Sequence, residues 1–130
     1  MIKWYENKDE NLDKEIIANF LLKEFACSCG KCKLTAIDSK ILTALGKLRK
    51  EFGEAIKINS GYRCQQHNRE DIKGAMYSYH CRGMAVDLEM PKNLEKRKKF
   101  LELARKCFVV VRVYKDKGVC HCDVGTKREW

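Results

Sequence analysis

Helical periodicity in the first half of the chain restricts its fold more than any other feature. Apolar residues recur there every three to four positions, as on one face of an amphipathic helix: Ile41, Leu42, Leu45, Leu48 and Phe52. Asp38 is a suitable N-cap and Gly53 suits the C-terminal end, so we predict a helix over residues 39–52. Residues 93–106 show similar spacing and predict a second helix.

Four other stretches have the character of strands. Residues 55–60 alternate between apolar and polar side chains, and residues 83–88 resemble them. Residues 108–114 and 119–124 are rich in β-branched side chains, and residues 115–118 between them have the composition of a hairpin turn. These patterns predict an α+β fold, in which a small, mainly antiparallel sheet has helices packed on it.

Length and composition predict one domain. A chain of 130 residues with 45% hydrophobic residues can bury one core. No apolar run approaches the ~18 residues that a membrane span needs. Residues 1–18 are polar and weakly patterned, so we expect an N-terminal arm there, loosely attached or forming a surface helix. The single domain would then comprise residues 19–130.

The formal charge of +9 favours anionic partners, among them nucleic acid, an acidic membrane face and an acidic cell-wall polymer. Charge alone does not choose among them. Residues 92–99 carry part of this charge, and a solvated helix face is the simpler interpretation of that run. Because the sequence shows no nucleic-acid reader motif, we expect no nucleic-acid partner.

The first ten residues contain no apolar segment of the kind found in a secretory signal. We therefore expect no signal peptide, and synthesis in the cytoplasm. A target outside the cell would require another route of exit, or a signal that has been removed.

Two of the three histidines lie in short motifs with nearby carboxylates. Ser78-Tyr-His80 precedes Asp87 by a short spacer, and His121 precedes Asp123 by one residue. A zinc site of the catalytic type takes three protein ligands, and two imidazoles with one carboxylate suit it. From spacing alone, metal ligation by His80, Asp87 and His121 and a structural role for the histidines are equally good interpretations.

A resemblance to a known family changes that balance. Three motifs carry it in this order: Ser60-Gly-Tyr-Arg63, Ser78-x-His80-x-x-Gly83-x-Ala85-x-Asp87, and His121-x-Asp123-Val-Gly125. Together they resemble the M15 family of zinc peptidases, which includes D-alanyl-D-alanine carboxypeptidases and phage endolysins. Residues 19–30 resemble the beginning of that family's domain, so the likeness covers roughly residues 19–125.

The resemblance implies a hedgehog/D-Ala-D-Ala-peptidase-like fold and a zinc metallopeptidase that hydrolyses peptidoglycan stem peptides or cross-links. It implies His80, Asp87 and His121 as zinc ligands. Arg63 would bind a substrate carboxylate or stabilise an oxyanion. Ser78 would bind substrate or orient its loop. The implied setting is an endolysin or a D,D-carboxypeptidase-like enzyme, acting as a monomer on the cell wall after release by a holin-type route.

The sequence departs from the family pattern at one position. Many relatives carry an acidic residue three positions before the last zinc histidine, where this chain has Gly118. Asp123 is our candidate for the missing role, either accepting a proton or holding a zinc ligand in place. Asp116 is a weaker candidate. The departure motivates an alternative function, a non-catalytic zinc-binding cell-wall module on the same fold.

Eight cysteines are many for a chain of this length. Cys27, Cys29, Cys32 and Cys64 could bind a second, structural zinc, or Cys27 or Cys29 could form a disulfide with Cys64. The sequence leaves both alternatives open. We predict that Cys120 and Cys122 are core residues or form disulfides. We expect Cys81 and Cys107 to be buried free thiols.

The third histidine, His67, follows the Arg63 motif. We interpret it as a capping or surface residue, because a fourth protein ligand would close a catalytic zinc site.

Overall fold

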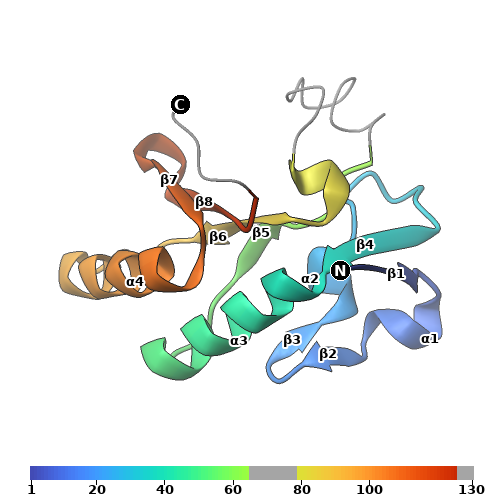
Figure 1. Cartoon of the computed structure of the whole chain (residues 1–130), viewed down its shortest axis with the longest axis horizontal. Helices are drawn as coiled ribbons and strands as arrows, with labels where there is room; N and C mark the ends of the chain where they lie inside the picture. Colours follow the sequence, from blue (N-terminus) through green and yellow to red (C-terminus); the bar gives the residue numbers. More distant parts are fainter. Residues whose placement is uncertain (65–78, 126–130) are drawn as a thin grey trace.

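The computed structural model describes residues 1–64 and 79–125 and has the predicted α+β fold (Figure 1). Its main sheet has four strands in the order β5-β6-β8-β7, and all neighbouring pairs are antiparallel. The strands are β5 (Ile58–Ser60), β6 (Ala85–Glu89), β8 (Val119–Asp123) and β7 (Val110–Tyr114). Within the described part, no helix is long and apolar enough to cross a membrane.

The two predicted helices are confirmed as α3 (Ser39–Phe52) and α4 (Leu94–Cys107). The Asp38 carboxylate accepts a hydrogen bond from the Lys40 N–H at 2.9 Å, which satisfies a backbone donor at the start of α3. Gly53 ends α3 with a φ of 76°, in the left-handed region that favours glycine. The Asn93 side chain caps α4 in the same way as Asp38 caps α3.

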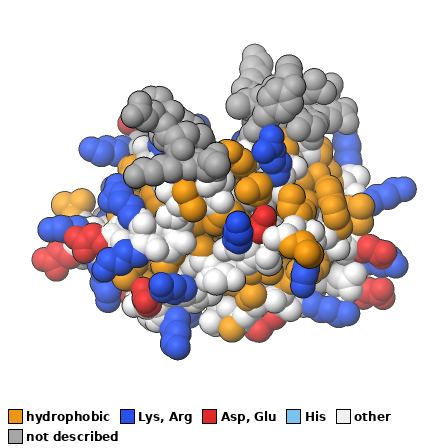
Figure 2. All heavy atoms as spheres, viewed as in Figure 1, with side chains coloured by type: hydrophobic (Ala, Val, Ile, Leu, Met, Phe, Trp, Pro, Cys, Tyr) orange, Lys and Arg blue, Asp and Glu red, His pale blue; other side chains and the backbone are white. Residues whose placement is uncertain are grey.

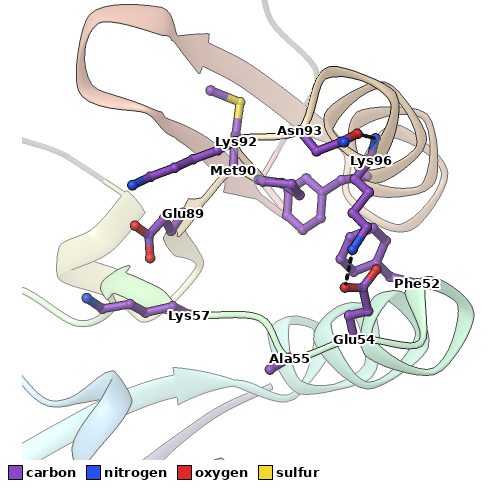
Figure 3. Close-up of a pocket in the computed structure, with 11 residues that line it drawn as sticks. Phe52, Glu54, Ala55, Lys57, Glu89, Met90, Lys92, Asn93 and Lys96 are labelled. Atoms are coloured by element: carbon purple, nitrogen blue, oxygen red, sulfur yellow. Dashed lines mark hydrogen bonds and ion pairs between the residues drawn. The ribbon is translucent and has the colours of Figure 1, made fainter.

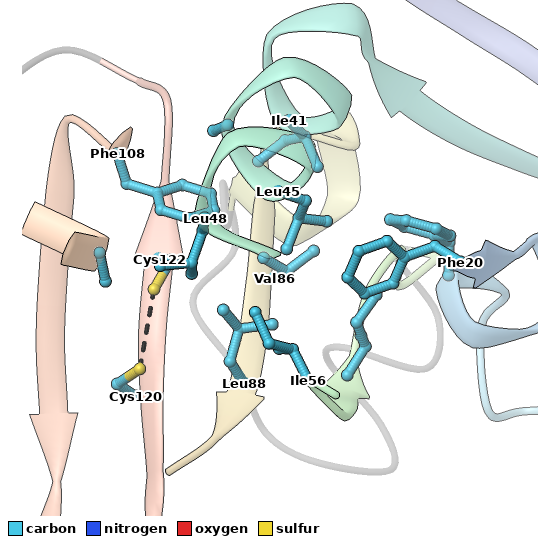
Figure 4. Packing of buried hydrophobic residues seen from close by; sticks show 14 of the residues in the cluster. Phe20, Ile41, Leu45, Leu48, Ile56, Val86, Leu88, Phe108, Cys120 and Cys122 are labelled. Carbon is cyan, nitrogen blue, oxygen red and sulfur yellow. Dashed lines mark hydrogen bonds between the residues drawn. The ribbon is translucent and has the colours of Figure 1, made fainter. Parts of the chain in front are cut away.

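The core lies between α3 and the main sheet (Figure 4). Leu45 and Leu48 of α3 pack with Leu88 of β6, and all three side chains are fully buried. Cys120 and Cys122 of β8 belong to this cluster and are also fully buried. They had been predicted to be core residues or to form disulfides, and the structure shows them as core residues with free thiols.

The segment before residue 19, expected to be a loosely attached arm or a surface helix, contains a paired strand. Its strand β1 (Ile2–Glu6) pairs antiparallel with β4 (Leu34–Asp38), so backbone hydrogen bonds fasten it to the domain. Most side chains of β1 are exposed, and for that reason its sequence lacks the alternation that predicts a strand. Trp4, in this strand, is 58% exposed and lies edge-on to the ring of Tyr62 at 5.9 Å between centroids.

Short elements complete the N-terminal half of the chain. They are α1 (Asp9–Leu12), β2 (Glu15–Ile17), β3 (Phe20–Leu21) and α2 (Leu22–Phe25). β2 and β3 form a small antiparallel pair, and α2 contacts β5 of the main sheet. The N-terminal half therefore packs against the β5 edge of the main sheet, and the candidate site includes the turn that follows β5.

Two single-turn 3₁₀ helices adjoin the main sheet. η2 (Tyr79–Arg82) leads into β6, and η3 (Lys115–Lys117) joins β7 to β8 at the predicted hairpin turn. On the face seen in Figure 2, Lys and Arg side chains are spread widely and interspersed with Asp and Glu. Among the described residues on this face, no single basic stripe of the kind that follows a nucleic-acid backbone is seen.

Candidate metal centre

Three of the site residues predicted from the sequence lie close together, two on the central strands of the main sheet and one in η2 beside it. Asp87 and His121 lie directly opposite each other in the register of β6 and β8. His80 comes from η2, immediately before β6. One ligand atom from each of the three residues lies within 4.8 Å of the others.

His80 is held by the turn after β5. Its side chain is only 2% exposed, and its Nδ1 lies 2.8 Å from the Gly61 carbonyl oxygen. Because a carbonyl can only accept, we infer that Nδ1 carries the proton in the neutral imidazole. Nε2, which lies 3.1 Å from Asp87 Oδ1, is then the nitrogen that can bind a metal.

His121 is oriented from its other side. Its Nε2 lies 2.6 Å from Asp123 Oδ2, and its Nδ1 lies 3.3 Å from Asp87 Oδ1. In the neutral tautomer that donates from Nε2 to Asp123, Nδ1 is the nitrogen that can bind a metal. Asp123 is fully buried, and its second oxygen accepts a hydrogen bond from the Gly125 N–H at 3.0 Å. Burial would lower the pKa of His121, but the carboxylates of Asp123 and Asp87 raise it above its ordinary value.

Asp87 is shared between the histidines and an arginine. Its Oδ2 accepts a hydrogen bond from Arg63 Nη2 at 3.0 Å, while Arg63 Nε donates to Ser60 Oγ at 3.1 Å. Burial alone would raise the pKa of Asp87. The contacts with His121 and His80 and the charge of Arg63 instead hold this pKa well below its usual range.

The donor set and its spacing fit a zinc ion. With both imidazoles neutral, two nitrogen lone pairs and one carboxylate oxygen face the same point, an arrangement that a cation stabilises. Zinc bonds of about 2.0–2.2 Å at a tetrahedral angle separate neighbouring ligand atoms by about 3.4 Å. The 3.1 Å and 3.3 Å separations at Asp87 Oδ1 are close to that value.

Two glycines allow the backbones to meet closely around this group. A Cβ on Gly83, whose φ is 70°, would lie 2.3 Å from the Ala36 carbonyl oxygen of β4. A Cβ on Gly61 would lie 2.7 Å from the backbone of Phe25 in α2. Larger side chains at either position would therefore displace η2 or the turn that holds His80.

The other predicted residues have different positions. Ser78 and His67 lie outside the described residues. Asp116 is exposed in η3, and Gly118 ends that turn with a φ of 67°. The sequence interpretation did not assign a role to the Gly61 carbonyl or to Ser60, although both belong to the motif that contains Arg63.

A second group of possible metal ligands comprises Cys27, Cys29, Cys32 and Cys64, whose sulfur atoms lie within 4.8 Å of one another. Cys81 and Cys107, predicted to be buried thiols, are partly buried.

A cavity of about 390 Å³ lies elsewhere, where the end of α3 meets the start of α4 (Figure 3). Phe52 and Phe100 line it together with charged side chains, including Lys57, Glu89 and Lys92. No member of either candidate metal group lines this cavity, so it is separate from the site described above.

Comparison with models of protein families gave a match over most of the chain. The family model described as Peptidase M15 matches residues 18–123, which include all three residues of the candidate metal centre. Searches of curated proteins and of solved structures found no match.

Proposed function

Because the chain belongs to the peptidase M15 family, we propose that it is a zinc metallopeptidase that hydrolyses peptide bonds in bacterial peptidoglycan. Stem peptides or cross-links would be the substrate. The observation that carries the proposal is the convergence of His80, Asp87 and His121, each of which has a second contact that fixes its orientation. Such outer contacts are typical of zinc ligands.

A zinc ion held there would polarise the scissile carbonyl and lower the pKa of a water molecule to about 7. Arg63 brings positive charge to the edge of this group and holds Asp87 through Oδ2. We propose that it also engages a carboxylate or an oxyanion of the substrate, for which a guanidinium is well suited. Ser78 remains a proposed substrate-binding or loop-orienting residue.

Asp123 is better suited to orienting His121 than to moving a proton. It is fully buried, and each of its oxygens already accepts a hydrogen bond. A fixed, charged acceptor on Nε2 selects the tautomer in which Nδ1 can bind metal.

One observation favours the second candidate, a non-catalytic zinc-binding cell-wall module. Gly118 occupies the position where many relatives carry an acid, and its left-handed backbone strains any other L-residue there. Peptide hydrolysis needs a proton acceptor. Gly118 has no side chain to serve as one, and Asp123 is buried with both oxygens in hydrogen bonds. This module would bind cell-wall material without cutting it.

The biological setting stays a proposal by family analogy. We propose a monomer that reaches the wall after synthesis in the cytoplasm, through a holin-type route. An anionic wall polymer would be a further partner of the basic chain.

The test is release of new amino groups from purified peptidoglycan, with and without a chelator. His80→Ala should abolish release, whereas Glu89→Ala, which alters an exposed residue of the same sheet, should retain it. Mass analysis of the products would identify the bond. If folded, zinc-loaded protein binds walls of several chemotypes but releases nothing, the peptidase is excluded and the binding module is supported.

A further inference from the structure

The four-cysteine group joins two segments that are distant in sequence. Cys27, Cys29 and Cys32 lie in the loop between α2 and β4, and Cys64 follows β5. The sulfur of Cys29 is 3.4 Å from that of Cys32 and 4.0 Å from that of Cys64. The sulfur of Cys27 is 3.9 Å from that of Cys64.

These distances match a metal–thiolate cluster. Zinc–sulfur bonds of about 2.3 Å at a tetrahedral angle separate neighbouring sulfurs by about 3.8 Å. A disulfide would need about 2.05 Å. Four sulfurs facing one another also give a complete donor set, whereas Cys120 and Cys122 form only a pair in the apolar core, with sulfurs 3.7 Å apart.

The surroundings also suit negative charge on sulfur. The Lys31 N–H donates to Cys29 Sγ at 3.4 Å, and backbone donors of this kind stabilise a thiolate. Lys31 and Lys33, on either side of Cys32, are exposed and carry positive charge. Cys29, Cys32 and Cys64 are only partly buried, so an ion has access to the cluster.

We propose that Cys27, Cys29, Cys32 and Cys64 bind a structural zinc ion, which fastens the loop after α2 to the turn after β5. Four thiolates fill the tetrahedral coordination of zinc, so this site has no open position for substrate and no role in chemistry. The proposal does not depend on the proposed peptidase activity.

The turn fastened in this way also supports the candidate metal centre. The Tyr62 N–H donates to the Phe25 carbonyl at 2.7 Å, and the Arg63 N–H donates to the His80 carbonyl at 3.2 Å. Cys64 directly follows Arg63 in the chain. The cluster therefore anchors the end of the segment that carries both the Arg63 guanidinium and the Gly61 carbonyl.

Cobalt(II) titration of the reduced, metal-free full chain tests the proposal. Thiolate ligands give cobalt an intense near-ultraviolet charge-transfer band, which imidazole and carboxylate ligands do not give. We expect this band to saturate at one cobalt per chain and to disappear when zinc is added. The band should persist in His80→Ala, which separates this cluster from the candidate metal centre.

Matched cysteine variants identify the ligands. Cys29→Ser should weaken or abolish the band, while Cys81→Ser should leave it unchanged. Metal analysis of the purified protein should find one zinc more in Cys81→Ser than in Cys29→Ser. A wild-type chain with reduced thiols but no charge-transfer band would overturn the proposal, even if a variant fails to fold. Purified protein that holds iron in place of zinc, or that has the four thiols in disulfides before metal removal, would also overturn it.

Discussion

The two groups of possible metal ligands are built in different ways. His80, Asp87 and His121 are attached to regular elements, and each has a partner outside the group: the Gly61 carbonyl, Arg63 and Asp123, respectively. The four cysteines lie in loops, and their sulfur atoms contact one another and backbone N–H groups such as that of Lys31.

This difference indicates how strongly the geometry of each group depends on a bound metal ion. The first group is held by sheet register and charged hydrogen bonds that persist without an ion. In the second group, the sulfur atoms contact one another as thiols, which bond weakly to each other when protonated. We therefore expect a preassembled site in the sheet and a metal-assembled site in the loops.

The largest expected effect is that of a substitution that disrupts the first group and leaves the cysteine group intact. Asp87→Ala removes the carboxylate that both histidines contact and also removes the ion pair between Asp87 and Arg63. Peptidase activity should therefore fall below detection. The cobalt–thiolate band should remain. Amino-group release and the cobalt spectrum measure the two outcomes, and simultaneous loss of both would mean that the groups are not independent.

Next in size is the effect of Asp123→Asn. Because a neutral amide holds the His121 imidazole less firmly than a carboxylate, zinc affinity at the first group should fall about 10–100-fold. Competition with a metal indicator measures it, and Asp116→Asn, at an exposed carboxylate, is the control. If kcat falls at saturating zinc while affinity is unchanged, Asp123 transfers protons and does not merely orient His121.

Amide hydrogen exchange should show a smaller difference. After chelation, the backbone around residues 27–32 and 60–64 should exchange at least about tenfold faster, a change of ~1.4 kcal/mol, since the loops lose their common anchor. Strands β6 and β8 should change little. Equal acceleration in these strands would show that the first group also requires metal to assemble.

The smallest effect concerns the pH dependence of the metal-free protein. The pKa of Asp87 is lowered in the folded state, so its contribution to stability is present above the unfolded value of about 3.9 and is lost as pH falls through the folded value. Between pH 5 and pH 3, the Tm of the metal-free wild type should fall by a few degrees more than that of Asp87→Asn. Parallel curves would contradict the preassembled site.

Sequence reasoning predicted the elements that bury one clear face. Helix α3 was predicted at its observed bounds because its apolar spacing and both caps agree. Strand β4 was missed because four consecutive residues, from Thr35 to Asp38, are all buried, and no alternation marks it. Its partner β1 was missed for the opposite reason, since nearly every side chain is exposed.

The candidate site was predictable to a similar extent. The grouping of His80, Asp87 and His121 came from motif order, and the structure brings these residues together. The Gly61 carbonyl is a backbone atom whose role depends on where the turn lies, so residue types could not indicate it. The contact between Asp123 and His121 was predictable, because the two residues lie two positions apart on strand β8 and their side chains face the same way.

The contact between Trp4 and Tyr62 gives the protein a built-in optical reporter. The indole is partly exposed on β1, while the phenol it touches lies two residues before Cys64. Any shift of the turn relative to β1 would alter the polarity and quenching around the indole. With Trp130 replaced by phenylalanine, the fluorescence of Trp4 would report movement of the turn that carries Tyr62 and Cys64 in real time, without an attached dye.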